Sequence, residues 1–438
     1  MASSGVPKEA SVSWGWMVTL AGLGINLALG SLYTWSVISK AIPQEWGWTD
    51  TQKSLPYSVA VLVFSLMMVP GGRLQDQFGP RLVATIGGLL LGIGFIVASL
   101  TTQSWGYVLG FGLLVGSGIG FSYSACTPAA VKWFPASKTG MIAGIVVSGF
   151  GLAGVYASPL AQGLISLVGV QQTMLYLGLG FLVVVVVLAQ LLRVPPAGYV
   201  PGSKATAGNP APVGENKPAS PGDLPPMIRP DYSPIEVLRT WQFYVLWLMY
   251  AVGAGAGLMV ISKLAPLAKT QAGLELGFVL VAALALGNGI GRIITGTVSD
   301  RIGRRPTLLL CFVLQLVLML LLTQAKPGTV LATTPVMAVL SALIGANFGA
   351  NLALFPPLTK DYYGLKHFGA NYGMVFTAYG LGGFSLSLLA GRLFDIYQSY
   401  APACYVSAGL LALAAVLTLI ATPPRTNPPQ RLGNISRR

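Results

Sequence analysis

Twelve apolar runs of about 20 residues are the feature that most limits how this chain can fold. An α-helix of that length crosses the ~30 Å hydrocarbon layer of a membrane at 1.5 Å per residue. Only 9% of the 438 residues are charged and 54% are apolar, against roughly 25% and 45–50% in soluble domains. A β-barrel is disfavoured because its strands give alternating segments of about 10 residues. The sequence therefore predicts an all-α membrane protein with twelve transmembrane helices.

The predicted spans form two groups of six, separated by a proline-rich stretch. They are 14–38, 54–72, 82–102, 107–130, 141–165, 172–192, 241–262, 275–298, 307–325, 334–358, 370–392 and 402–421. The stretch between the groups contains 11 prolines and no apolar periodicity, which is typical of an extended linker. We therefore predict four parts, namely a six-helix half over 1–193, a linker over 194–238, a second six-helix half over 239–421 and a tail over 422–438.

The net charge of +14 is explained by membrane orientation. The basic residues lie between apolar runs and form no basic domain laced with aromatic residues, so we expect no nucleic-acid partner. With the N-terminus inside, 19 Lys and Arg residues fall on the cytoplasmic side and about 6 on the other. The positive-inside rule then places both termini in the cytoplasm. We expect a multi-pass protein of the inner (plasma) membrane whose partner is the lipid bilayer, and we infer no obligatory protein partner.

The two groups of spans contain a repeated loop. GRLQDQFGPR recurs as GTVSDRIGRR, so that four residues reappear 224 positions later: Gly72, Asp76, Gly79 and Arg81 as Gly296, Asp300, Gly303 and Arg305. Both copies follow the second span of their half. A duplicated body of six plus six helices is the architecture of alternating-access transporters, which bind substrate near the midplane between the halves.

The repeated loop resembles the signature of the major facilitator superfamily, over essentially the whole chain. Each Asp stands at the C-terminal end of its helix, where the helix dipole disfavours a negative charge. In that superfamily the Asp is thought to face the start of a helix in the other half and to hold the inner gate closed. The resemblance therefore implies gating roles for Asp76, Arg81, Asp300 and Arg305, and a solvated turn is the alternative.

Further segments resemble the oxalate/formate antiporter family, a bacterial relative of the monocarboxylate transporters. They are EVLRTWQFYVLW at 236–247, WFP at Trp133 to Pro135, LFP at Leu354 to Pro356, NYG at Asn371 to Gly373 and GNGIGR at Gly287 to Arg292. These segments lie in both halves of the chain.

Arg292 is the one charge well inside an apolar span. Such a residue costs at least about 2.5 kcal/mol at mid-bilayer and normally faces a cavity or a partner. All twelve acidic residues fall in loops or near helix ends, so we predict that a substrate carboxylate supplies the counter-charge through two parallel hydrogen bonds. The position 224 residues earlier is Met68, which argues against a purely architectural role. The alternative is an arginine satisfied by backbone carbonyls or helping a gate.

The antiporter family places its anion-binding arginine at this same position. Its oxalate carrier has a second cation, a lysine in span eleven, where alignment through NYG puts Tyr379. Two cations suit a dianion and one suits a monoanion, so we favour a small monocarboxylate. Further candidate contacts, each with helix packing as its alternative, are Asn288, Tyr123, Tyr33, Phe348, Asn347, Asn351 and Tyr379.

We therefore predict a secondary active transporter of lactate- or pyruvate-like monocarboxylates that works by alternating access. Proton symport is the leading expectation, with H⁺ as the second partner. Similar eukaryotic monocarboxylate transporters couple to protons and have an Asp where this chain has Asn288, so the proton site stays open. Obligatory exchange of organic anions and a non-transporting carboxylate sensor are the alternatives. No pattern in the sequence indicates an enzyme, a cofactor or a metal site.

Overall fold

The computed structural model describes residues 10–196, 199, 231–273 and 277–424, and all regular structure in these ranges is helical. In the first half, α1, η1 and α2 form one continuous crossing, as do α5, the π-helical η3 and α6. The bounds are α1 Ala10–Leu29, η1 Gly30–Thr34, α2 Trp35–Ala41, η2 Gln44–Trp46, α3 Asp50–Phe78, α4 Pro80–Ser99, α5 Ser104–Tyr107, η3 Val108–Val115, α6 Gly116–Val131, η4 Ala136–Lys138 and α7 Thr139–Ala189.

The second half contains six long helices and two short ones. Their bounds are α8 Pro234–Leu238, α9 Trp241–Ala272, α10 Gly277–Ile302, α11 Arg304–Thr323, η5 Val330–Ala332, α12 Thr334–Tyr363, α13 Phe368–Tyr397 and α14 Ala401–Ile420. In the described ranges, eleven helices are long and apolar enough to cross a membrane.

One of these helices, α7, makes two crossings. Its 51 residues would measure about 76 Å as one straight helix, far more than the ~30 Å hydrocarbon layer. Gly169 interrupts it with a non-helical backbone (φ 78°, ψ 174°), a conformation that glycine adopts without a Cβ clash. The predicted spans 141–165 and 172–192 lie on either side of Gly169. The predicted fold of twelve transmembrane helices in two six-helix halves is thus confirmed.

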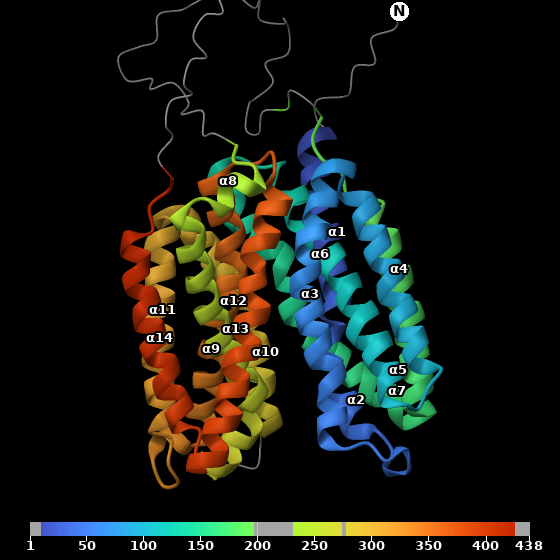
Figure 1. Ribbon diagram of the computed structural model, residues 1–438, viewed down its shortest axis with the longest axis vertical. Coiled ribbons are helices and arrows are strands. Elements are labelled where there is room, and N and C mark those ends of the chain that lie inside the picture. Colours follow the sequence, from blue (N-terminus) through green and yellow to red (C-terminus); the bar gives the residue numbers. More distant parts are fainter. Residues whose placement is uncertain (1–9, 197–198, 200–230, 274–276, 425–438) are drawn as a thin grey trace, which may run out of the picture.

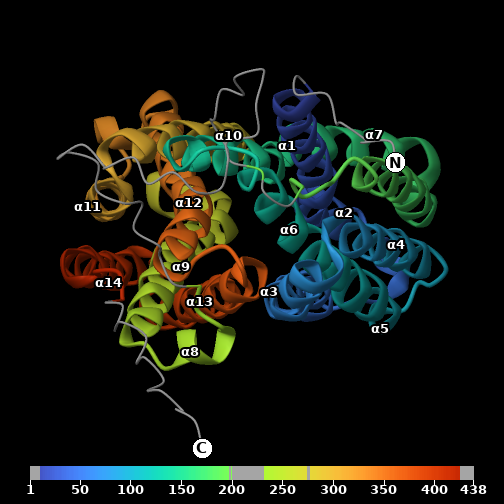
Figure 2. The same cartoon turned by 90° about the horizontal axis from the view of Figure 1, so that it is seen from above.

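The two halves stand side by side and meet along two seams (Figure 1). Seen along the helices, α10 lies beside α7, and α13 lies beside α3 (Figure 2). We call these contacts the α7–α10 seam and the α3–α13 seam. The end of the bundle where α1 begins, α8 lies and α14 ends is called the linker end, and the two groups of helices lean together there (Figure 1).

Glycines allow the backbones to touch in both seams at the linker end. A Cβ added at Gly72 would lie 2.0 Å from the carbonyl oxygen of Gly369, and one at Gly296 would lie 2.3 Å from that of Gly140. Any larger side chain at these positions would push the halves apart. The structure therefore has its linker end closed.

The end of the predicted linker differs from the extended chain expected there. Residues 234–238 form α8, which begins with a capping box between Ser233 and Glu236. The Asp231 carboxylate accepts hydrogen bonds from the backbone N–H groups of Leu365 and Lys366 at 2.8 and 3.0 Å. These contacts attach residues 231–238 to the loop between α12 and α13. Residues 200–230 lie outside the described part of the chain.

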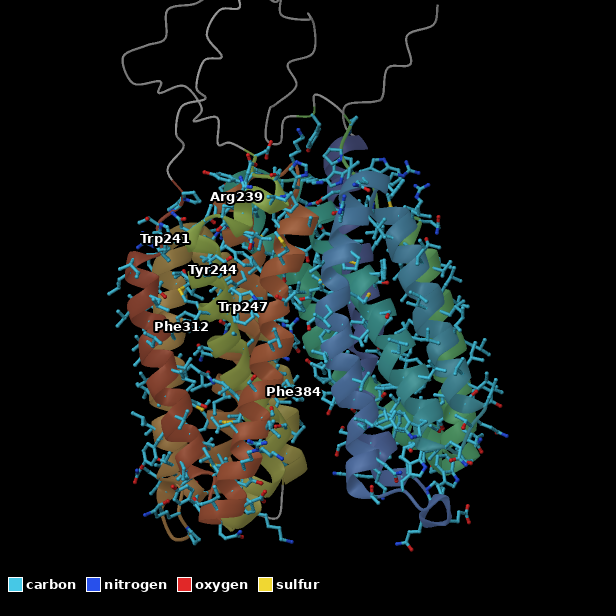
Figure 3. The ribbon with its side chains drawn as sticks, viewed as in Figure 1. Arg239, Trp241, Tyr244, Trp247, Phe312 and Phe384 are labelled. Carbon is cyan, nitrogen blue, oxygen red and sulfur yellow. The ribbon has the colours of Figure 1, made fainter. Side chains whose placement is uncertain are left out.

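Aromatic side chains mark the membrane interface near the linker end. Arg239 lies just before α9, and Trp241, Tyr244 and Trp247 follow one another down its start (Figure 3). Trp241 and Tyr244 are 50% and 59% exposed, as expected for residues of an aromatic belt at the headgroup level. By length and composition, Trp241–Leu264 is a candidate membrane span.

Candidate functional site between the two halves

The guanidinium of Arg292 is held between the halves. Arg292 lies on α10 and is fully buried. Its Nε donates to Oδ1 of Asn288, one turn earlier, at 3.1 Å, and its Nη1 donates to the Val147 carbonyl of α7 in the other half. Its Nη2 has no hydrogen-bond partner among the residues that the structure describes. Within the part of the chain that the structure describes, Arg292 forms no ion pair.

These contacts use only part of the donor capacity of the guanidinium. Arginine has five N–H donors, and the two hydrogen bonds to Asn288 and Val147 take two of them. The pair of N–H groups at the outer end, one on Nη1 and one on Nη2, has the spacing that matches a carboxylate. A buried donor without a partner costs about 1–3 kcal/mol, and more when it is charged. The site therefore favours an anion that accepts at Nη2.

An aromatic cluster from both halves surrounds the guanidinium. Its Cζ lies 6.0 Å from the ring centroid of Phe150. Across the halves, the ring centroids of Phe64 and Phe376 are 5.0 Å apart, and those of Tyr123 and Phe376 are 5.4 Å apart. Tyr379 stacks on Phe376 with a centroid separation of 5.0 Å. These rings form an apolar wall that would strengthen any ionic contact to Arg292 by excluding water.

Several tyrosine hydroxyls in this region also have unused hydrogen-bonding capacity. Tyr33, Tyr123, Tyr250, Tyr372 and Tyr379 lie near the Arg292 charge. The hydroxyls of Tyr33, Tyr123, Tyr250 and Tyr372 are buried and have no hydrogen-bond partner among the described residues. Buried polar groups are normally paired with protein, water or ligand. The central region is therefore chemically suited to a small polar anion.

The other predicted contacts are placed unequally around Arg292. Tyr33 lies close to Arg292, Asn288 and Tyr379. The ring centroid of Phe348 lies 6.2 Å from that of Tyr379. The amide nitrogens of Asn347 and Asn351 donate to carbonyls one turn earlier on α12. The Asn351 Oδ1 faces Gly253 of α9 within the same half and has no hydrogen-bond partner among the described residues. Within the described part of the chain, neither asparagine forms a hydrogen bond with Arg292.

Sequence reasoning missed several residues of this region. They are Phe64, Val147, Phe150, Tyr250, Tyr372 and Phe376. One signal was available, because Tyr372, Phe376 and Tyr379 recur at helical spacing on one face of α13. No signal marked Val147, since its contribution is a backbone carbonyl.

Both aspartates of the repeated loop bind the start of a helix in the opposite half. The Asp300 carboxylate accepts from the backbone N–H groups of Gly140 and Met141 at 2.9 and 2.7 Å. The Asp76 carboxylate accepts from those of Gly369 and Ala370 at 3.1 and 2.9 Å. The helix dipoles of α7 and α13 favour this negative charge at their N-termini. The two aspartates thereby connect the halves at the linker end.

The arginines of the repeated loop do not take part in these contacts. Arg81 is exposed, and Arg305 donates to the carbonyls of Thr418 and Leu419 at the end of α14 in its own half. The neighbouring Arg304, which sequence reasoning missed, forms a 2.6 Å ion pair with Asp300 and donates to Thr139 Oγ1 across the halves at 2.9 Å.

The comparisons with known proteins agree with this architecture. The family model of the Major Facilitator Superfamily matches residues 18–282 and 266–435. An uncharacterised transporter of this type from Escherichia coli strain K12 is 26% identical over 84% of this chain and 85% of its own length. The oxalate:formate antiporter of Oxalobacter formigenes is 26% identical over 83% of this chain and 81% of its own.

A pyruvate carrier and a sugar symporter extend this list. The apicoplast pyruvate carrier 1 of Toxoplasma gondii is 26% identical over 71% of this chain and 64% of its own. The solved structure of the E. coli fucose:proton symporter FucP superposes with a TM-score of 0.65 at 14% identity, covering 92% of this chain and 98% of FucP. The chain therefore belongs to the Major Facilitator Superfamily.

Proposed function

We propose that this protein is a secondary active transporter of small monocarboxylates of the lactate and pyruvate type, with Arg292 as the anion-binding residue. The observation that supports this most directly is a buried guanidinium whose Nη2 has no partner among the described residues. It lies between two halves that must move relative to each other in alternating access. Relatives whose names refer to oxalate, formate and pyruvate support the same substrate class.

The proposed binding mode follows from the contacts of Arg292. Asn288 and Val147 hold Nε and Nη1, so the carboxylate would accept from the outer pair of N–H groups on Nη1 and Nη2. Tyr33 and Tyr123, whose hydroxyls have no partner in the described part of the chain, would donate to a hydroxyl or carbonyl oxygen of the substrate. By the alignment through NYG, Tyr379 would stand where the oxalate carrier has a second cation. One cation suits a monoanion, because a second carboxylate would be buried without a counter-charge.

The proposed transport cycle places the linker end in the cytoplasm, as the positive-inside rule requires. In the present conformation Asp76 and Asp300 close that end. Substrate binding would neutralise Arg292 and lower the cost of moving it past the apolar wall. The halves would then rock, breaking the contact between Arg292 and Val147 and opening the linker end.

Coupling to protons is the first candidate mode, and exchange of anions is the second. A specific observation favours exchange: Arg292 contacts the neutral Asn288, and arginine itself hardly deprotonates. An empty carrier would then have to move an uncompensated cation, which is unfavourable in a dry interior. Symport requires that the substrate or another group bring the proton.

Uptake by the purified protein in proteoliposomes tests both the substrate class and the coupling. Labelled lactate, pyruvate, formate and oxalate are each supplied with and without a pH gradient, and with and without internal anion. Saturable uptake of lactate or pyruvate driven by an inward proton gradient supports symport. Uptake that ignores pH and requires internal anion supports exchange. Uptake confined to oxalate would refute the monoanion assignment, and binding without accumulation would indicate a sensor.

A further inference from the structure

A pocket of about 250 Å³ opens between the halves at the linker end. The first half contributes Val131, Lys132, Phe134, Pro135, Ala136 and Thr139, and the second half contributes Lys360 and Leu365. The pocket is separate from the Arg292 region, because Lys132 follows the last residue of α6 and Lys360 lies near the end of α12.

Two lysines from different halves line this one small space. Lys360 donates to Thr139 Oγ1 at 3.1 Å and lies 3.5 Å from Asp361. Asp361 is shared with Arg304, which lies 3.4 Å away. Lys132 has no ion-pair partner among the described residues. Burial lowers the pKa of the Lys132 ammonium, and the charge of Asp76 opposes that shift.

The nearby carboxylates are already engaged by other donors. Asp76 accepts two backbone N–H groups of α13, and Asp300 accepts two of α7 together with Arg304. Asp361 pairs with Lys360 and with Arg304. The lysine of this pocket without an ion-pair partner among the described residues is Lys132, and an anion beside it would compensate its charge. Charge therefore favours an anionic occupant of the pocket.

The remaining walls define what kind of anion fits. Val131, Phe134, Pro135 and Leu365 are apolar, and a strongly hydrated inorganic ion would gain nothing from them. An organic anion with an apolar body can bury that body against these side chains while its carboxylate lies between the lysines.

We infer that the pocket between Lys132 and Lys360 is a second, regulatory site for a small organic carboxylate with an apolar body. Because both halves form its walls, the pocket exists only while the linker end is closed. A ligand that binds one conformation stabilises that conformation. At a ligand concentration of about a hundred times its Kd, the ratio of closed to open protein rises about a hundredfold. Occupancy therefore holds the linker end closed and slows turnover.

Binding is tested on the full-length protein carrying Arg292→Ala, which removes the proposed central site. Sodium benzoate is the probe, with sodium chloride at equal ionic strength as the reference, and the unfolding temperature is the readout. We expect a saturable rise in that temperature. Adding Lys132→Gln should weaken the apparent affinity at least tenfold, since a charge-assisted hydrogen bond is lost. Lys138→Gln is the matched control, because Lys138 is exposed and does not line the pocket.

A second readout reports on the closed linker end itself. Benzoate should slow hydrogen exchange of the Gly369 and Ala370 amides, which donate to Asp76, and should not do so in Lys132→Gln. Lys132→Arg, which keeps the charge, should restore the effect. Equal responses of the Lys132→Gln and Lys138→Gln proteins, or no saturable response in either readout, would overturn the inference. Neither result bears on uptake through Arg292, so the two proposals fail independently.

Discussion

The two seams between the halves share the same backbone contacts and differ in the fully buried charge of Arg292 and in the ion pair of Arg304. In the α7–α10 seam, Asp300 binds the start of α7, and a Cβ at Gly144 would lie 2.4 Å from the Arg292 carbonyl oxygen. In the α3–α13 seam, Asp76 binds the start of α13, and a Cβ at Gly373 would lie 2.3 Å from the Met68 carbonyl oxygen. Met68 and Arg292 are thus structural equivalents.

This comparison separates architecture from function. The carboxylate contacts and the glycines occur in both seams. Closure of the linker end therefore depends on these contacts in each seam. The guanidinium occurs in one seam only, and Met68 is fully buried in the other. A backbone arrangement that tolerates methionine does not require arginine. The charge in the α7–α10 seam therefore calls for an explanation beyond packing, which the proposed substrate supplies.

Replacing Arg292 by methionine, the residue at the equivalent position of the other seam, should have the largest effect on carboxylate binding. Arg292→Met removes two charge-assisted hydrogen bonds to the carboxylate, so we expect monocarboxylate affinity to fall at least about a hundredfold. Binding is measured by ligand-dependent thermal stabilisation and by uptake. Arg292→Lys keeps a charge without the paired donors and should fall between wild type and Arg292→Met. Unchanged affinity in a folded Arg292→Met protein would reject the assignment.

The glycine contacts should be equally sensitive in both seams. Gly72→Ala and Gly296→Ala each place a Cβ within 2.3 Å of a backbone carbonyl oxygen of the other half, so the linker end cannot close as observed. We expect uptake to fall by about tenfold or more in each, as for other overpacked interfaces. Gly180→Ala is the control, because a Cβ there meets nothing within 4 Å. A marked difference between the two variants would show that the seams are not equivalent.

Neutralising the aspartates should reveal a smaller asymmetry. Asp76→Asn and Asp300→Asn each lose an acceptor for a backbone N–H, worth about 1–3 kcal/mol. Asp300→Asn also breaks the 2.6 Å ion pair with Arg304 and should be the more severe change. Hydrogen exchange of the helix-start amides measures this, with Gly140 and Met141 expected to accelerate more than Gly369 and Ala370. The opposite order would mean that Arg304 does not stabilise the α7–α10 seam.

The smallest effect is expected at the methionine equivalent of Arg292. Met68→Leu conserves volume, so the free energy of unfolding should change by less than about 1.5 kcal/mol and carboxylate affinity should stay as in wild type. Denaturant unfolding and uptake measure the two quantities. A loss of affinity comparable to that of Arg292→Met would show that the α3–α13 seam also contacts substrate.

Parts of the site could be predicted because they depend on local sequence. Arg292 is visible as a charge inside an apolar run, and Asn288 precedes it by one helical turn. Asp300 lies near the end of α10 and Arg304 begins α11, with the non-helical Gly303 (φ 95°) between the two helices. Their ion pair therefore depends on the turn at Gly303, and the register of the repeat directed attention to Arg305 instead. Residues 304 and 305 point in directions about 100° apart on a helix, so the neighbour of the expected residue makes the contact.

Other parts depend on which elements meet. The contact of Arg292 with the Val147 carbonyl joins residues that are 145 positions apart. Asn351 has the polarity expected of a ligand, but its Oδ1 faces Gly253 within its own half. A polar residue on a membrane helix can face a central site or a neighbouring helix, and its own sequence neighbourhood does not distinguish these cases.

The sequence alone determined the number of spans, their division into halves, the repeated loop and the single deep charge. These follow from the free energy of transferring each segment into lipid, which is a property of local composition. Only the tertiary structure decided that Arg292 contacts the Val147 carbonyl, that Asp76 and Asp300 each bind the start of a helix in the other half, and that aromatic rings from both halves pack together beside Arg292. Those features depend on packing between distant segments, which composition does not encode.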